Sequence, residues 1–300
     1  MALAFLQYDV FTGEVLTGNQ LAVFLDGRGL QPERMQAIAR EMNFSETTFI
    51  VPPEQPGTDV RMRIFTPGVE LPMAGHPTIG STFALAHAGT IPPGTVRFVF
   101  GLGVGPTPVD LEWEDSRLRF VWMTQRLPEF GPVLENRTAA AAAIGLDVRD
   151  VVPDLPVQQV SCGLPYLLIP LRDKATVDRA ISDAGAIRRL SVATAMDDSV
   201  FLFAVSPAGS PETVYSRMFA SQFGVLEDAA TGSASGPLGA YLVRYHVVAG
   251  AAAGQILCLQ GVAMGRPSRI YVAIEGTAAA ITSVKVGGEA ILVAEGQLLI

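Results

Sequence analysis

Apolar and polar residues alternate along much of the first third of the chain, with the period of two that is typical of half-buried strands. Strands are predicted on this basis at residues 3–10 and 60–65, at 21–25 next to a turn-rich loop, and at 46–51 from β-branched residues. Between them, Met35, Ile38 and Met42 fall on one face of a helical pattern over residues 31–42. This part of the chain is therefore predicted to be β-rich with one surface helix.

Two segments have a different pattern, that of a helix buried on every side. Residues 78–87 are rich in Ala and Leu, and residues 234–245 are interrupted only by Arg244. Each follows a glycine-rich segment, residues 72–80 and 227–239. A helix start presents unpaired N–H groups and the positive end of the helix dipole, which favour an anion. Two such starts suggest one anion site built from both halves of the chain.

The remaining pattern divides the chain into two similar halves. Strands are expected at residues 96–100, 111–114, 118–122, 157–161, 166–169, 200–205, 213–219, 270–274, 280–286 and 290–300, and helices at 135–144, 174–183 and 184–191. Residues 127–133 break the strand pattern with two prolines and a glycine. We predict domains at 1–127 and 128–289, with a last strand, about 290–300, able to pair back onto the first domain.

Composition and charge narrow the ligand class. The net charge of −8, without clustered Lys and Arg, argues against nucleic acid. An acidic protein that holds an anion must use local donors and helix ends. The two cysteines, Cys162 and Cys258, form neither a disulfide framework nor a metal-binding pattern, so we expect no metal and a reducing cytoplasm. No basic leader or membrane span is expected, since apolar stretches such as 247–253 are far shorter than about 20 residues.

Polar residues at the two helix starts are candidates for the site. Gly75 and His76 open the first, with His76 expected at the cap, where the dipole disfavours imidazolium and leaves a neutral ring. His76 as a simple cap is an equally good interpretation. At the second start Asp228 precedes Thr231, Gly232 and Ser233, and glycine lets a ligand approach the backbone.

Asp228 by itself fits a capping or loop carboxylate better than a ligand-binding group. The segment around it also lacks the phosphate-loop and dinucleotide fingerprints, so nucleotide binding is not expected. The third candidate is Glu46, a carboxyl at the start of an apolar, β-branched strand. Partial burial there would suit general acid–base work, although a solvated surface glutamate is the commoner case.

Several motifs in order resemble those of the phenazine-biosynthesis PhzF-like isomerases over nearly the whole chain. They are Tyr-Asp-Val-Phe-Thr (8–12), Gly-Asn-Gln-Leu-Ala-Val-Phe (18–24), Asn-Phe-Ser-Glu-Thr-Thr-Phe (43–49), Phe-Thr-Pro (65–67), Leu-Pro-Met-Ala-Gly-His-Pro-Thr-Ile-Gly (71–80), Gly-Leu-Pro-Tyr (163–166), Ser-Arg-Met-Phe-Ala (216–220) and Glu-Asp-Ala-Ala-Thr-Gly-Ser (227–233). The chain departs from the family pattern at Gln20 and Ala229, where the family usually has proline. Alanine at 229 loosens the loop beside Asp228, since only proline fixes φ.

The resemblance implies an α+β fold of the diaminopimelate-epimerase-like type: two similar domains, each a barrel-like sheet around a central helix, with the active site in the cleft between them. It also implies a homodimer that needs no cofactor. Glu46 would be the catalytic acid–base, and His76, Asp228 and Ser233 would line the pocket. Related racemases use one cysteine at each central-helix start, and this chain has none at Gly75–His76 or at Asp228.

The sequence therefore predicts a cofactor-independent isomerase that moves a proton within a small, carboxylate-bearing, anionic substrate, similar to trans-2,3-dihydro-3-hydroxyanthranilate isomerase. The substrate carboxylate would lie on the helix N–H groups, with His76 and Ser233 as donors and Asp228 on an amino or hydroxyl group. One alternative is a non-catalytic carboxylate- or metabolite-binding protein on the same fold. A second, weaker alternative is an amino-acid epimerase or racemase with non-thiol bases.

Overall fold

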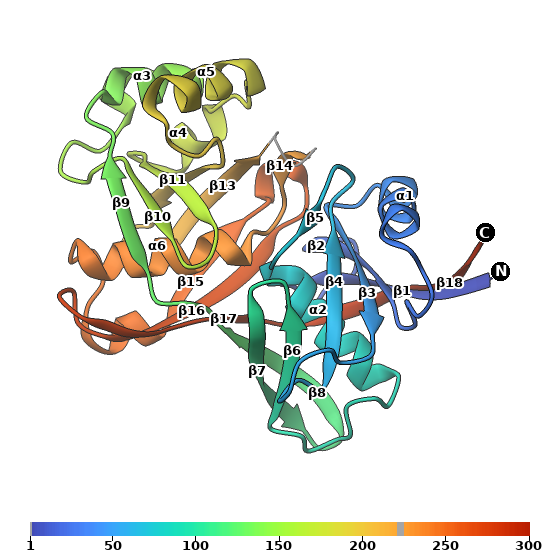
Figure 1. Ribbon diagram of the computed structural model, residues 1–300. Coiled ribbons are helices and arrows are strands. Elements are labelled where there is room, and N and C mark those ends of the chain that lie inside the picture. The colour runs from blue at the N-terminus through green and yellow to red at the C-terminus, as the bar shows by residue number, and fades with distance from the viewer. Residues whose placement is uncertain (1, 221–224) are drawn as a thin grey trace. The chain divides into compact units, whose positions relative to one another are not determined.

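The chain folds into two compact units (Figure 1). A computed structural model describes residues 2–220 and 225–300. The first unit comprises Met1–Thr124 and Val286–Ile300, and the second comprises Gln125–Lys285. Strand β17 (Ile281–Gly288) contains the second boundary. The first unit is therefore completed by the C-terminal end of the chain.

Unit 1 is built from strands that surround one helix. The strands are β1 (Ala2–Val10), β2 (Asn19–Phe24), β3 (Glu46–Val51), β4 (Val60–Phe65), β5 (Glu70–Leu71), β6 (Arg97–Leu102), β7 (Gly105–Glu114), β8 (Arg117–Thr124) and β18 (Ala290–Leu299). Strand β1 pairs antiparallel with β2 and with β18, so the C-terminal strand does pair back onto unit 1. Strand β2 runs parallel to β3, whereas β6, β7 and β8 form an antiparallel meander.

Helix α2 (Gly75–His87) is the central helix of unit 1 (Figure 1). It contacts β1, β2, β3, β8 and β18, and every residue from Gly75 to Leu85 is buried. Gly80 allows this close packing, because a Cβ there would lie 2.6 Å from Leu21 Cδ2 and 2.7 Å from Val10 Cγ2. The predicted buried helix is confirmed, and its glycine sets the distance between helix and strands.

A second apolar layer of unit 1 lies under helix α1 (Pro32–Met42). Met35, Ile38 and Ala39 of this helix pack in one cluster with phenylalanines of β2, β3 and β4. Phe24 and Phe49 stack with their ring centroids 5.0 Å apart. The helical stripe read from the sequence is thus the face that α1 buries.

Unit 2 repeats the plan of strands around a buried helix. Its strands are β9 (Glu129–Val133), β10 (Gln158–Ser161), β11 (Pro165–Pro170), β12 (Val200–Val205), β13 (Val214–Ala220), β14 (Val225–Asp228), β15 (Ile256–Gln260) and β16 (Ser268–Gly276). The central helix α6 (Gly232–Arg244) contacts β10, β11 and β16 and is buried over its first 12 residues (Figure 1). Helices α3 (Arg137–Ala143), α4 (Lys174–Arg179) and α5 (Ala184–Thr194) cover a separate apolar cluster.

The structure corrects three of the predicted elements. Residues 129–133, read as a break, form β9; Val133 and Phe130 pair with β10, and the register shifts between these pairs, where Pro132 lies. The helix predicted over 174–183 ends at Arg179, because Ala180 is extended and Asp183 caps the next helix. Strands β14 and β15 were not predicted at all.

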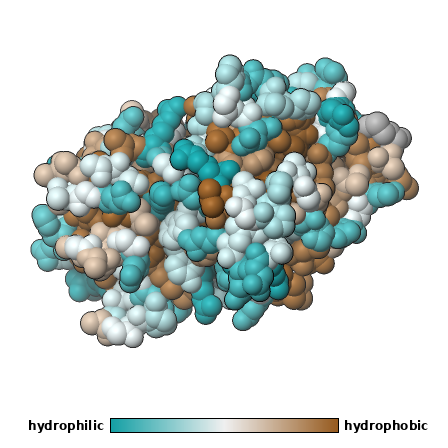
Figure 2. Space-filling view, turned by 90° about the horizontal axis from the view of Figure 1, so that it is seen from below, coloured by the Kyte–Doolittle hydropathy of each residue, from teal (hydrophilic) through white to brown (hydrophobic). Residues whose placement is uncertain are grey.

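Exposed side chains include isolated large apolar residues such as Val96 and Val192, which are 74% and 71% exposed. The face drawn in Figure 2 mixes hydrophilic and hydrophobic residues. Among the helices of the described residues, none is long and apolar enough to cross a membrane.

Candidate active site

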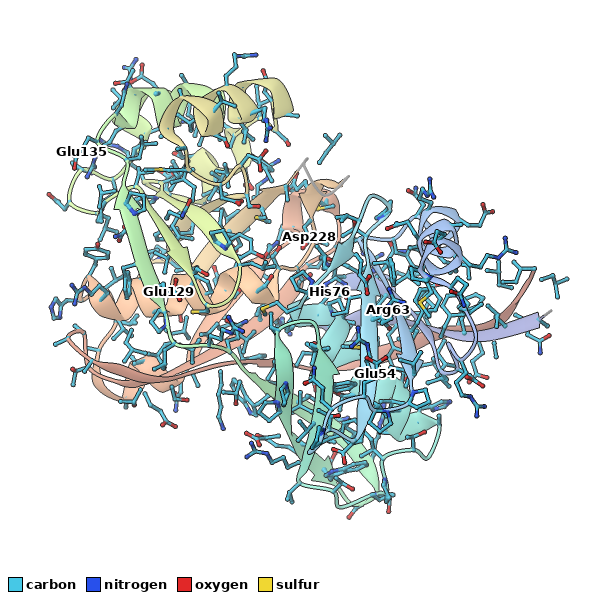
Figure 3. The ribbon with its side chains drawn as sticks, viewed as in Figure 1. Glu54, Arg63, His76, Glu129, Glu135 and Asp228 are labelled. Atoms are coloured by element: carbon cyan, nitrogen blue, oxygen red, sulfur yellow. The ribbon has the colours of Figure 1, made fainter. Side chains whose placement is uncertain are left out.

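Glu46 and His76 face each other in unit 1. Glu46 is the first residue of β3, and His76 is the second residue of α2. Glu46 Oε2 and His76 Nε2 lie 3.3 Å apart, with only 14% and 3% of the two side chains exposed. Figure 3 labels His76 on its helix. The structure thus brings together two residues that lie on different elements and that the sequence singled out separately.

His76 is a neutral ring in this environment. Burial lowers its pKa to about 3, an effect that the nearby backbone carbonyl of Gln20 opposes only in part. The pair with Glu46 is therefore a carboxyl facing an uncharged imidazole, and not an ion pair, at any pH near neutrality. This lowered pKa agrees with the neutral state predicted for His76, and burial is its main cause.

The placement of His76 at the helix cap was wrong. The N-cap of α2 is Ala74, which has extended backbone angles, and Gly75 is the first helical residue. Pro77 is the third, where the missing N–H removes no intrahelical hydrogen bond. His76 therefore projects from inside the first turn, fixed by helical geometry.

Asn19, at the start of β2, is the other polar partner of His76. Its Nδ2 lies 3.2 Å from His76 Nδ1, and its Oδ1 accepts a hydrogen bond of 2.9 Å from Ser45 Oγ. Asn19 is 2% exposed. Gly18 makes the preceding turn with φ of +66°, and a Cβ there would lie 2.5 Å from the Val10 carbonyl oxygen. The turn therefore places the Asn19 side chain next to the His76 ring.

The strand that carries Glu46 is also fastened to α2 by hydroxyl groups. Thr48 Oγ1 and Ser81 Oγ share a hydrogen bond of 2.9 Å, both fully buried. Leu21 of β2 is the parallel neighbour of Glu46. Strand β3 is consequently joined to β2 by backbone pairing and to α2 by a side-chain hydrogen bond.

In unit 2, Asp228 is the last residue of β14 (labelled in Figure 3) and belongs to a buried hydrogen-bond network. Thr231 Oγ1 donates to Asp228 Oδ2 at 2.6 Å. Gln260 Nε2 donates to Thr231 Oγ1 at 3.0 Å and to the Asp228 carbonyl at 2.8 Å, while Gln260 Oε1 accepts from the Thr231 N–H. Because Gln260 occupies the Thr231 oxygen as a donor, the threonine hydroxyl must point its hydrogen at the carboxylate.

Ser233 has its own partner. Its Oγ lies 2.6 Å from the Tyr166 Oη of β11, and both side chains are buried. Gly232, the first residue of α6, accepts a hydrogen bond of 2.9 Å on its carbonyl from Gln125 Nε2. The predicted residues of the second helix start therefore fall into two hydrogen-bonded sets, one on Asp228 and Thr231 and one on Ser233.

The strands that carry Asp228 are braced by Arg217 of β13. Arg217 pairs with Glu227 through two hydrogen bonds of 2.8 Å, and its Nη1 donates to the carbonyls of Val177, Asp178 and Ala180 at the end of α4. This ion pair fixes the residue immediately before Asp228.

Both central helices begin without a capping side chain. Neither Ala74 of α2 nor Thr231 of α6 makes a side-chain cap bond, whereas Asn136, Asp173 and Asp183 cap the peripheral helices α3, α4 and α5. Helix α1 also has no side-chain cap, and an uncapped helix start is compatible with an anion site.

The two cysteines take no part in these groups. Both thiols are buried, and burial raises the pKa of Cys162 and of Cys258 to about 12. Neither lies at the start of a central helix. Within residues 2–220 and 225–300, no cluster of His, Cys, Asp and Glu has the geometry to hold a metal ion.

Four site residues were not singled out by the sequence pattern. Asn19, Ser45 and Tyr166 stand inside motifs quoted for the resemblance, so a signal existed for them. Gln260 lies in a strand that was not predicted, and its partners are about 30 residues away in the chain. Only the fold reveals its role.

Comparison with known proteins gives the family. The model of the "Phenazine biosynthesis-like protein" family, PhzC-PhzF, matches residues 8–296. The trans-2,3-dihydro-3-hydroxyanthranilate isomerase of Pseudomonas aeruginosa is 37% identical over 289 residues, 96% of each chain. The crystal structure of a PhzF-family phenazine biosynthesis protein from Bacillus anthracis covers all of both chains, with a TM-score of 0.87 and 26% identity.

A more distant structure bears on the fold alone. A probable proline racemase from Agrobacterium radiobacter K84 superimposes with a TM-score of 0.71 over 99% of this chain and 93% of its own, at 12% identity. The predicted α+β, diaminopimelate-epimerase-like fold is therefore confirmed. The family model spans almost the whole chain and the bacterial isomerase is similar along its full length, so this chain belongs to the phenazine biosynthesis-like family of isomerases.

Proposed function

We propose that Glu46 is the catalytic acid–base of a cofactor-independent isomerase that moves a proton within a small carboxylate-bearing substrate. The observation that carries the proposal is the 3.3 Å approach of the Glu46 carboxyl to a neutral, buried His76. The substrate we propose is trans-2,3-dihydro-3-hydroxyanthranilate, after the name of the similar Pseudomonas aeruginosa enzyme.

The proposed step conserves atoms and electrons. The Glu46 carboxylate takes a proton from a ring carbon, and the C–H electron pair forms a new double bond to the adjacent ring carbon. The π pair displaced by this shift takes the same proton back from the carboxyl at another carbon. An enol product then becomes the ketone as its hydroxyl proton is transferred to carbon. Nothing enters or leaves the substrate, so the step needs no cofactor.

His76 helps to keep the proton on Glu46. An imidazole whose pKa is about 3 does not take a proton from a neighbouring carboxylic acid. The proton removed from the substrate therefore stays on the carboxyl that must return it. His76 serves as a fixed, uncharged neighbour of the reacting group.

We propose further that each uncapped helix start is a substrate-binding group of its own unit: Gly75 and His76 in unit 1, and Gly232 and Ser233 in unit 2. Asp228 would accept from the substrate amino or hydroxyl group, with Thr231 holding its carboxylate in place. The bonds of Thr231 and Gln260 in unit 2 support this role for Asp228, because they orient it without neutralising it.

A turnover assay with a matched pair of variants tests the role of Glu46. Conversion of the dihydro-hydroxyanthranilate is followed by proton NMR in D₂O, with deuterium incorporation as a second readout. Glu46→Gln should lower turnover by about 10²- to 10⁴-fold, the usual loss for a general acid–base. Glu54→Gln removes an exposed carboxyl that pairs with Arg61 in the same unit and should keep wild-type turnover.

Three results would count against the proposal. Equal turnover in wild type and Glu46→Gln would remove Glu46 from the mechanism. Tight binding of small carboxylates in a calorimetric screen, without turnover or deuterium exchange, would instead favour a metabolite-binding protein. A change in optical rotation with an amino acid would point to an epimerase.

The homodimer and the cytoplasmic location also remain proposals. Two buried, unpaired thiols suit a reducing compartment. Sedimentation velocity of the purified protein would decide the oligomeric state.

A further inference from the structure

Asn19 is the residue from which a new role follows. It connects three elements: its own strand β2, the start of β3 through Ser45, and α2 through His76. Ser45 and Glu46 are neighbours in the chain, so the contacts form a closed circuit in which Ser45, Asn19, His76 and Glu46 follow one another. All contacts lie within unit 1.

The direction of the hydrogen bonds around this circuit follows from the orientation of the Asn19 amide. Asn19 Oδ1 accepts from the Ser45 hydroxyl at 2.9 Å, and the amide nitrogen lies on the side of the His76 ring. An amide nitrogen can only donate, so the His76 Nδ1 at 3.2 Å must accept and cannot carry a hydrogen. In a neutral imidazole the hydrogen then resides on Nε2, the atom that lies 3.3 Å from Glu46 Oε2.

We propose that Asn19 is a positioning residue of the isomerase: by donating to Nδ1 it fixes His76 as the Nε2–H tautomer, which places the ring hydrogen on the nitrogen that lies 3.3 Å from the Glu46 carboxyl. This role rests on the proposed function of Glu46. The opposite tautomer would turn a lone pair toward the carboxylate, and two acceptors facing each other in a buried site repel. The tautomer therefore decides whether the contact between His76 Nε2 and the Glu46 carboxylate is attractive or repulsive.

The tautomer can be read directly in the free protein by nitrogen-15 NMR of the imidazole rings, without any substrate. The chain has three histidines, so a His76→Gln spectrum assigns the ring of interest. In wild type we expect His76 with a protonated Nε2 and an unprotonated Nδ1. A His76 ring protonated at Nδ1, donating to the Gln20 carbonyl, would overturn the proposal.

Substitution of Asn19 supplies the second arm. Asn19→Asp replaces the donor with an acceptor of the same shape, so the ring hydrogen should move to Nδ1 and the spectrum should show the exchange. The turnover of this variant should fall about 10- to 100-fold, the usual cost of losing a residue that orients a reacting group. The loss should appear in kcat more than in KM, because the substrate contacts remain.

Thr48→Val is the control for a purely structural role of Asn19. This variant breaks the hydrogen bond to Ser81 that joins the same strand to the same helix, without touching the circuit. It should retain the wild-type tautomer and most of the wild-type turnover. If Asn19→Asp changes the tautomer and leaves kcat unaltered, or if Thr48→Val lowers kcat as much as Asn19→Asp does, the positioning role is refuted.

The two arms separate this inference from the proposed function. If wild type fails to turn over the candidate substrate, the NMR arm still decides the tautomer and its dependence on Asn19. If turnover depends on Glu46 and the tautomer does not depend on Asn19, only the inference fails.

Discussion

Buried His76 should make the stability of unit 1 depend on pH in a way that one substitution removes. In the unfolded chain the ring has its ordinary pKa of 6.5, whereas burial lowers the pKa in the folded protein to about 3. Above pH 6.5 the ring is unprotonated in both states, and its full contribution to stability is present. As the pH falls below 6.5, the unfolded chain takes up a proton that the folded protein does not.

The magnitude follows from these two pKa values. Between pH 6.5 and pH 3 the free energy of unfolding loses about 1.4 kcal/mol per pH unit through this one group. From pH 7 to pH 5, the loss integrates to about 2 kcal/mol. A variant without the ring, His76→Gln, lacks this loss. Between pH 7 and pH 5, wild type should therefore lose about 2 kcal/mol of stability relative to His76→Gln.

Urea unfolding at pH 7 and pH 5 measures this difference. The chain has two tryptophans, Trp113 and Trp122, and both lie in unit 1 with His76, so fluorescence reports on the relevant unit. Thr78→Val is the matched control: it removes a buried hydroxyl from the same helical turn and titrates nothing. Its stability difference from wild type should be the same at both pH values.

The reasoning would be refuted by a wild-type to His76→Gln difference that is equal at pH 7 and pH 5. That result would mean that the folded ring takes up its proton as readily as the unfolded one, and so that water reaches it. The neutral neighbour proposed for Glu46 would then be lost as well.

Three further variants test what supports the site. Gly80→Ala should destabilise unit 1 by about 1–3 kcal/mol, because the new methyl group would lie 2.6 and 2.7 Å from apolar side chains of β2 and β1. Gly254→Ala is the control, since a Cβ there has nothing within 4 Å, and it should leave thermal unfolding unchanged. Arg217→Met should lower the free energy of unfolding, followed by circular dichroism, by about 3–5 kcal/mol, because the Glu227 carboxylate loses its partner. A double variant with Glu227→Met that regains no stability would contradict this reasoning. Gln260→Leu should lower stability by about 1–3 kcal/mol and raise KM of the proposed reaction, and an unchanged KM would show that the network does not serve binding.

Local patterns in the sequence were sufficient for the elements that bury a regular face. The stripe of α1, the fully apolar helices α2 and α6, and the strands β3, β4 and β12 have the predicted type because periodicity reports burial directly. Strands β14 and β15 were not predicted, because their structure depends on pairing with other strands more than on their own pattern. Each is only four or five residues long, and pairing with β13 and β16 makes them strands.

The site shows the same division. Residue types at the two helix starts, together with a glutamate on a β-branched strand, indicated which groups would carry the chemistry. Asn19 and Glu46 lie 57 and 30 positions away from His76 in the chain. Their distances of 3.2 and 3.3 Å to its two ring nitrogens could therefore not be predicted from the sequence. Those contacts exist because β2 and β3 run parallel and α2 packs against both.

The sequence by itself thus determined the fold class and the family and indicated several polar candidates, since these depend on local composition and order. Only the tertiary structure decided that burial lowers the pKa of His76, that this residue lies inside the first turn of α2, and that Asn19 and Gln260 contact the predicted residues. The physical reason is that burial and hydrogen-bond direction are properties of what surrounds a residue, and the surroundings of His76 and Asp228 are supplied by distant segments of the chain.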